Sequence, residues 1–146
     1  MLLDRDGRLA AVLDASAPRH PTPTPQWVED RFWPWVHYLA GKLARGELFE
    51  VIDGLGFLRA RVFGPLVLAR VGAQPAGVRR FEASAPDWVD PLRATVPQHD
   101  AADCARAVRA AIALYRELRR SASPAVEQRG DAERAAMAFL DQVTGS

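Results

Sequence analysis

The chain has 146 residues, of which 49% are apolar and 25% charged, proportions typical of one globular domain with a buried core. Its formal net charge of +1 gives no general attraction to nucleic acid or to an anionic membrane, so neither is predicted as a partner. A single cysteine, Cys104, excludes an internal disulfide framework and favours a reducing cytoplasm. The chain has no apolar run long enough to span a membrane and does not begin like a signal peptide.

Residues 1–25 are expected to form an arm and a proline-rich linker in front of the domain. The segment 2–13 predicts a β-hairpin, because its central Asp-Gly pair tolerates the positive φ of a tight turn. A lone hairpin is barely stable in water, so it needs a sheet from elsewhere. Asp4 and Asp6 resemble the start of a calcium loop, but the later ligands and closing glutamate are absent, which favours a plain turn and no metal.

Residues 26–146 are expected to form a bundle of four or five main helices. Apolar residues recur at steps of three and four from Val28 to Leu43 and again from Leu48 to Leu66, which predicts two consecutive amphipathic helices. Thr24-Pro25 suits an N-cap and a first helical residue. Pro34 is expected to kink the first helix or restart it, and Gly64-Pro65 to do the same to the second.

The second half of the chain continues the helical pattern. One or two short helices are expected over 78–96, interrupted at Pro86 and Pro91. The clearest helix is 101–120, with Asp100 as its N-cap, and a last helix follows Gly130. The fold class predicted is therefore mainly α, a helical bundle with a short N-terminal β-hairpin arm.

No complete active site is recognisable among these elements. Arg31 and His37 have the spacing used by some helical RNases, but apolar residues and a proline lie between them, so His37 at a core edge is the favoured interpretation. The arginines of the helix over 101–120 lie opposite its apolar stripe and predict a solvated outer face: Arg106, Arg109, Arg116 and Arg120. The tryptophans are interpreted as core or interface anchors.

Two segments carry a family resemblance: KLARGEL, from Lys42 to Leu48, and PAGVRRFE, from Pro75 to Glu82. In this order, after an LLDRDGRL strand-turn and a proline-rich linker, they resemble the helical C-terminal half of nucleotidyltransferase-like proteins, a superfamily similar to the aminoglycoside and lincosamide adenylyltransferases. The resemblance covers about residues 2–120.

The resemblance implies that a separate α/β domain carries a Gly-Ser motif and an Asp-x-Asp pair that holds Mg²⁺ and a nucleoside triphosphate. This chain has no such arrangement, so we expect no catalytic residue, no cofactor and no nucleotide transfer by the chain alone. The resemblance makes residues 2–13 the final hairpin of the missing sheet. It also nominates six candidate substrate- or nucleotide-binding residues: Lys42, Arg45, Glu47, Arg79, Arg80 and Glu82.

Other roles for the six charged residues and for the chain remain open. The six charged residues could instead form salt bridges that fix a helix to the next loop. The chain could be a small interaction module that forms a homodimer, or binds a separately encoded nucleotidyltransferase domain, through a surface of Trp27, Trp33 and Trp35. A helical RNase using Arg31 and His37 is the weakest alternative.

Overall fold

The structure is a computed structural model that describes residues 22–146, and every regular element in that range is helical. The mainly α class is thereby confirmed, whereas the expected hairpin over residues 2–13 lies outside the described residues. The long helices are α2 (Pro25–Ala44), α3 (Leu48–Leu58), α7 (Ala101–Arg120) and α8 (Gly130–Thr144).

The remaining elements are shorter. A π-helical segment, η1 (Arg59–Phe63), joins α3 directly to α4 (Gly64–Arg70), so residues 48–70 form one continuous helical rod. The short helices expected over 78–96 are α5 (Phe81–Ser84), η2 (Pro86–Trp88) and α6 (Val89–Arg93).

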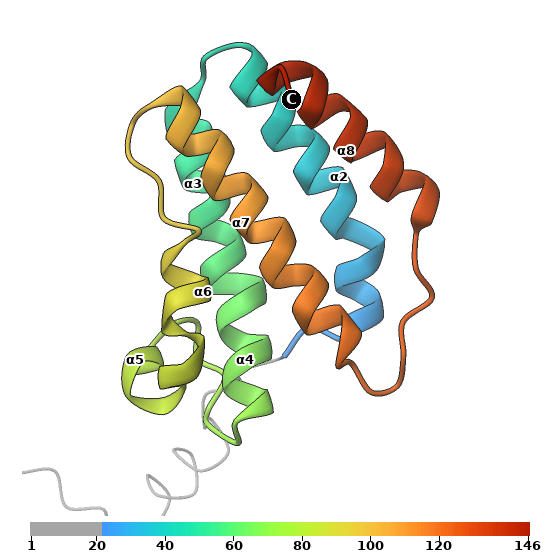
Figure 1. Ribbon diagram of the computed structural model, residues 1–146. Coiled ribbons are helices and arrows are strands. Elements are labelled where there is room, and N and C mark those ends of the chain that lie inside the picture. The colour runs from blue at the N-terminus through green and yellow to red at the C-terminus, as the bar shows by residue number, and fades with distance from the viewer. Residues whose placement is uncertain (1–21) are drawn as a thin grey trace, which may run out of the picture.

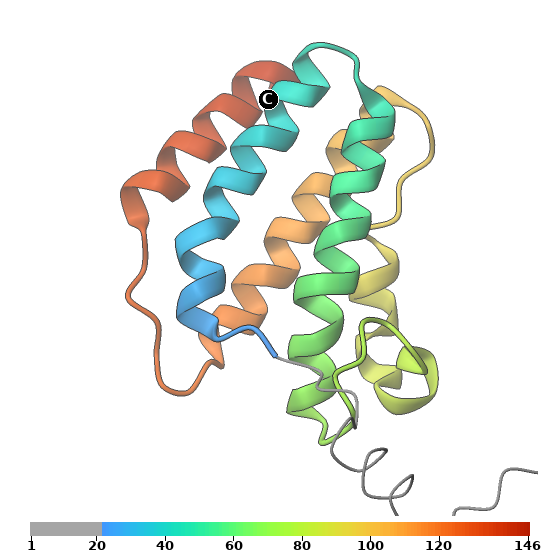
Figure 2. The same cartoon turned by 180° about the vertical axis from the view of Figure 1, so that it is seen from behind.

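Helix α2 occupies the centre of the arrangement. It packs against α3, α7 and α8, and Figure 1 shows it between α7 and α8. The turn between α2 and α3 lies at one end of the bundle and α5 at the other, as the reverse view confirms (Figure 2). A group near that turn and a group near α5 are therefore separated by the length of the bundle.

Local side-chain signals set where the long helices begin. The Thr24 hydroxyl accepts a hydrogen bond from the Trp27 amide at 3.3 Å, and Pro25 is the first residue of α2. The Asp100 carboxylate accepts from the Asp103 amide at 2.9 Å at the start of α7. Both caps are as expected from the sequence.

Of the two alternatives expected at Pro34, a kink or a restart, the restart is wrong, because α2 runs from residue 25 to 44 through this proline. Pro34 is exposed, whereas Phe32 and Val36 on either side of it are buried. Both halves of the helix bury apolar side chains in the same core. We infer that this burial outweighs the one backbone hydrogen bond that proline removes.

At Gly64-Pro65 the helical rod changes register without breaking. The Gly64 amide donates to the Arg59 carbonyl, five residues back, which is the π-helical pattern. Gly64 also lies against the loop before α5, where a Cβ on it would come within 2.3 Å of the Gly77 carbonyl oxygen. Glycine is therefore required here for the loop to approach the rod.

The core is aromatic where α2 meets α7. The rings of Phe32 and Tyr115 stack with centroids 3.9 Å apart, and Trp33 meets Phe32 edge-on at 5.1 Å. Phe32 and Trp33 are completely buried and Tyr115 is nearly so. Such packed aromatic pairs contribute beyond the area they bury.

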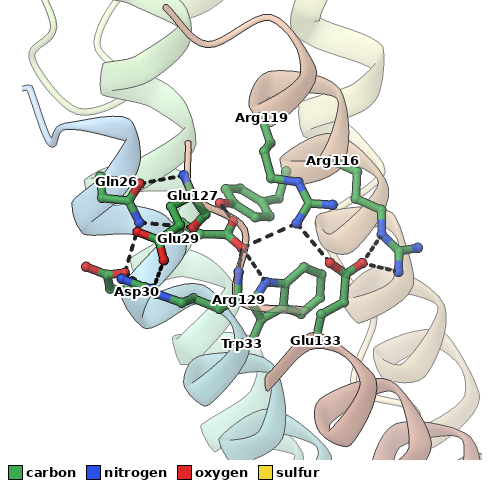
Figure 3. A network of polar contacts seen from close by, with 10 residues as sticks. Gln26, Glu29, Asp30, Trp33, Arg116, Arg119, Glu127, Arg129 and Glu133 are labelled. Atoms are coloured by element: carbon green, nitrogen blue, oxygen red, sulfur yellow. Dashed lines mark hydrogen bonds and ion pairs between the residues drawn. The ribbon is translucent and has the colours of Figure 1, made fainter. Parts of the chain in front are cut away.

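A carboxylate, Glu29, lies inside this core and is completely buried (Figure 3). It accepts hydrogen bonds from the Trp33 indole at 3.2 Å, the Arg129 amide at 2.8 Å, and the hydroxyl of Tyr115. The Arg119 guanidinium lies 3.4 Å from it. Burial and this neighbouring carboxylate raise the pKa of Tyr115, so its hydroxyl remains a donor. Four donors compensate the cost of burying the charge.

The network continues from Arg119 to α8. Glu133 accepts from Arg119 at 2.8 Å and from Arg116 at 2.7 Å. Burial opposes the charge on Glu133, but these hydrogen bonds outweigh it and lower the pKa of that carboxyl. Arg109 similarly reaches Asp141 of α8 at 2.9 Å.

The solvated-face interpretation of the α7 arginines therefore needs correction. Arg106 and Arg120 pair within α7, with Asp103 and Glu117, but Arg109 and Arg116 tie α7 to α8. The acidic partners of those two lie more than 15 residues away in the sequence, so helical spacing within α7 gave no sign of them.

We expect Glu29→Ala to lower the free energy of unfolding by about 3 kcal/mol or more, because it leaves the donors of Trp33, Tyr115 and Arg129 unpaired in the core. Urea denaturation measures the change. Glu117→Ala, which removes an exposed partner of Arg120, is the matched control and should cost less than about 1 kcal/mol. Equal effects of the two substitutions would contradict this account of the core.

We expect Gly64→Ala to destabilise the fold by about 1–3 kcal/mol, because its Cβ would meet two backbone carbonyl oxygens that cannot easily move. Gly56→Ala is the control in the same rod: its Cβ would meet only a flexible side-chain atom, 3.6 Å away, and alanine favours a helix. Thermal melting of both variants tests this, and a Gly64→Ala protein as stable as Gly56→Ala would refute it.

Candidate functional site

Three of the six candidate residues form a salt-bridge clamp across the turn between α2 and α3. Glu47 accepts from Lys42 at 2.7 Å and from Arg45 at 3.0 Å. The Lys42 ammonium also lies 5.2 Å from the ring centre of Tyr38 and 4.0 Å from Glu50. The salt-bridge interpretation left open by the sequence therefore describes the geometry of these three residues.

The clamp has a clear electrostatic signature. Hydrogen bonds from Arg45 and Lys42 lower the pKa of Glu47 to about 2, and the same contacts raise the pKa of both basic groups. All three groups are therefore charged near neutral pH. The Glu47 carboxylate is engaged by both basic groups, so it is less available to a substrate than an unpaired carboxylate would be.

The other three candidates lie around the start of α5. Arg79, Arg80 and Glu82 are exposed, and among residues 22–146 they form no ion pair or side-chain hydrogen bond. Arg80 has a φ of 56°, so the chain reverses sharply there before α5. These groups are free to meet a solute, in contrast to the clamp.

The structure does not bring the two sets together. Lys42, Arg45 and Glu47 lie at the α2–α3 turn, and Arg79, Arg80 and Glu82 lie at the opposite end of the bundle, beside α5 (Figures 1 and 2). They cannot line one small cleft within this bundle.

A second candidate surface runs along α2, and the sequence predicted it only in part. Trp27, Trp35 and Tyr38 of α2 and Phe57 of α3 form this aromatic face. The Trp27 and Trp35 rings have centroids 5.8 Å apart, and Trp35 meets Phe57 at 5.4 Å. Trp27, Tyr38 and Phe57 are 41%, 49% and 45% exposed, so a large apolar surface remains in contact with water.

Two hollows indent the aromatic face. A wide one of about 660 Å³ lies between Pro23, Trp27, Phe57 and Arg61, and a smaller one of about 140 Å³ lies between Trp35, Tyr38 and Phe57. The Arg31 guanidinium lies 4.3 Å from the ring centre of Trp27. Aromatic rings with arginine beside them are the residue types most often found at binding hot spots.

The signal for this face is present in the sequence. Trp27, Arg31, Trp35, Tyr38 and Lys42 follow steps of four, four, three and four, which place them on one stripe of a helix. The expected surface of Trp27, Trp33 and Trp35 is wrong in one member, because Trp33 is completely buried on the opposite side of α2. Two of its three residues do lie on the exposed stripe.

Arg31 and His37 do not form a joint site. Arg31 stacks on Trp27 and donates to the Trp27 carbonyl, on the side of the aromatic face. His37 stacks on Phe139 of α8 with ring centroids 4.5 Å apart. At 100° per residue they are about 120° apart around α2 and contact different neighbours, so they do not face one phosphate as an RNase pair would.

Comparisons of the chain with known protein families, with characterised proteins and with solved structures gave no match. Within residues 22–146, no helix is both long and apolar enough to cross a membrane, and no group of three or more potential metal-ligating side chains occurs.

We expect the clamp to make stability depend on acid pH. Because the pKa of Glu47 in the fold is lowered to about 2, its contribution is present above its usual pKa near 4.5 and is lost as pH falls through about 2. The melting temperature of Glu47→Gln should therefore fall below that of the parent at pH 7, and the difference should shrink toward pH 2. High salt at pH 7 should also reduce it, because these groups are exposed. A difference that is constant with pH would refute the clamp.

Proposed function

We propose that residues 22–146 form a helical accessory domain of a nucleotidyltransferase-like protein, which shapes a substrate site and does not transfer nucleotides alone. The observation that carries this proposal is the aromatic face, because a folded monomer gains nothing from exposing Trp27 and Phe57 on either side of the half-buried Trp35. We infer that a catalytic α/β domain covers it.

The position of the face supports this inference. Thr22 and Pro23 line the wide hollow beside Trp27, so the chain enters the bundle at the edge of the face. The segment that resembles the final hairpin of the catalytic sheet, residues 2–13, precedes this point in the sequence. A sheet that included this segment would therefore be attached where the aromatic side chains are exposed.

In this proposal the charged groups have unequal roles. Arg79 and Arg80 are the basic groups available to an anionic substrate, because they form no ion pair within the described bundle. Lys42, Arg45 and Glu47 fix the α2–α3 turn through their mutual contacts. Mg²⁺ and the nucleoside triphosphate would be held by the catalytic half. The whole protein would be cytoplasmic.

The aromatic face also supports a second candidate, an interaction module that pairs with another copy of itself. Tryptophan and arginine dominate the energetics of many protein interfaces, and Trp27 with Arg31 supplies that combination on an exposed helix. In this case the partner surface would be the same face of a second chain, related by twofold symmetry.

In its own cells, we expect the domain to be accompanied by a catalytic half. A tagged chain should be recovered either as part of a polypeptide heavier than 16.0 kDa or with a second chain, and the extra sequence should contain a Gly-Ser motif and an Asp-x-Asp pair. For a second chain, Trp27→Ser with Trp35→Ser should abolish recovery. Phe49→Ser, which removes a 72% exposed ring outside the aromatic face, is the control and should not.

Intact-mass spectrometry and analytical ultracentrifugation separate the two candidates. A 16.0 kDa protein that sediments as a dimer, and as a monomer after the double tryptophan substitution, would favour the homodimer and contradict the accessory domain. A monomer without the two motifs in any co-purifying chain would contradict both.

A further inference from the structure

Arg59, the arginine that begins the π-helical segment, is half-buried and has no carboxylate partner among residues 22–146. Its Nη1 atom donates to the Thr95 carbonyl at 2.7 Å and lies 3.3 Å from the Thr95 hydroxyl. Thr95 is completely buried. Burial lowers the pKa of Arg59, which reflects the cost of holding this charge away from water. By contrast, the buried Arg119 has both Glu29 and Glu133.

Arg59 lines a hollow of about 300 Å³ between the rod and the short helices. The other walls are mostly apolar and come from Val78, Phe81, Val89, Leu92 and Val96. The close approach of Gly77 to Gly64 holds the loop that carries Val78 against the rod. π-Helical insertions are frequent at functional sites, and a cation in an apolar hollow of this size is a typical ligand-binding arrangement.

We propose that this hollow binds a small organic carboxylate with an apolar body, whose carboxylate group pairs with Arg59. The planar guanidinium is suited to a carboxylate, which it can hold through two parallel hydrogen bonds. Nη1 is engaged by Thr95, whereas Nε and Nη2 form no hydrogen bond within the described residues. The apolar walls would enclose the remainder of the ligand.

The charges around the hollow favour a monoanion over a phosphate. Arg93 also lines it but forms an ion pair with Asp90, so Arg59 is the lining cation without a carboxylate partner among residues 22–146. Arg79 and Arg80 adjoin the lining residues Val78 and Phe81 in the sequence, but neither lines the hollow. Glu82 adds a negative group to the same lining. A phosphate dianion normally requires more than one free cation, and a neighbouring carboxylate would repel it more strongly than a monoanion.

This site lies within the described bundle and needs no catalytic domain, so it does not depend on the proposed function and is tested on this chain alone. The probe is phenylacetate, followed by amide chemical shifts in NMR titrations. Saturable shifts are expected around Phe81, Thr95 and Val96. Phenylethanol, which has the same ring without the charge, and inorganic phosphate, which lacks the apolar body, should each bind at least about tenfold more weakly.

Two variants complete the test. Arg59→Gln retains a donor for the Thr95 carbonyl and should weaken phenylacetate binding about tenfold or more. Arg134→Gln, which changes an exposed arginine of α8 outside the hollow, is the control and should leave the affinity unchanged.

The proposal is overturned if phenylacetate gives no saturable shifts at the hollow, if phenylethanol or phosphate binds as well as phenylacetate, or if Arg59→Gln retains the parent affinity. Should Arg59→Gln fail to fold, the comparison of the three probes on the unmodified protein still decides the matter. If the carboxylate site is overturned, the proposal for the aromatic face and its partner is unaffected.

Discussion

The arrangement of this bundle depends on one carboxylate in its core, that of Glu29. A buried charge is tolerated only when donors surround it, and here they come from α2, α7 and the residue that precedes α8. The carboxylate therefore fixes elements that are 100 residues apart in the sequence. Through Arg119 and Glu133 the same network ties α8 to α7, so the charge on α2 helps to position α8.

The central helix α2 has two faces with different consequences. Its inner face supplies Phe32 and Trp33 to the core and anchors the bundle. Its outer stripe carries the exposed Trp27 and the half-buried Trp35, although their side chains are as apolar as those inside. An isolated domain has no physical use for such a stripe. A partner that covered it would remove its apolar surface from water.

Much of the fold could be predicted because its signals are local. The caps at Thr24 and Asp100 and the helical periodicity depend on residues three or four apart, and those distances are set by helix geometry alone. Pro34 misled the prediction because its local cost is about 3 kcal/mol or more, which burial on both sides of it can offset. The candidate site was less predictable, because a charged motif has the same sequence whether its side chains pair with one another or stay unpaired.

The sequence by itself determined the helical class, the positions of the main helices and the presence of two charged segments. Only the tertiary structure decided that Glu47 pairs with its neighbours while Arg79 does not, that Trp33 is completely buried while Trp35 is only half-buried, and that Arg59 lines a mostly apolar hollow. The physical reason is the separation in sequence of the residues that interact. Helix formation depends on nearby residues, whereas burial and charge pairing depend on side chains that come together only when the helices pack.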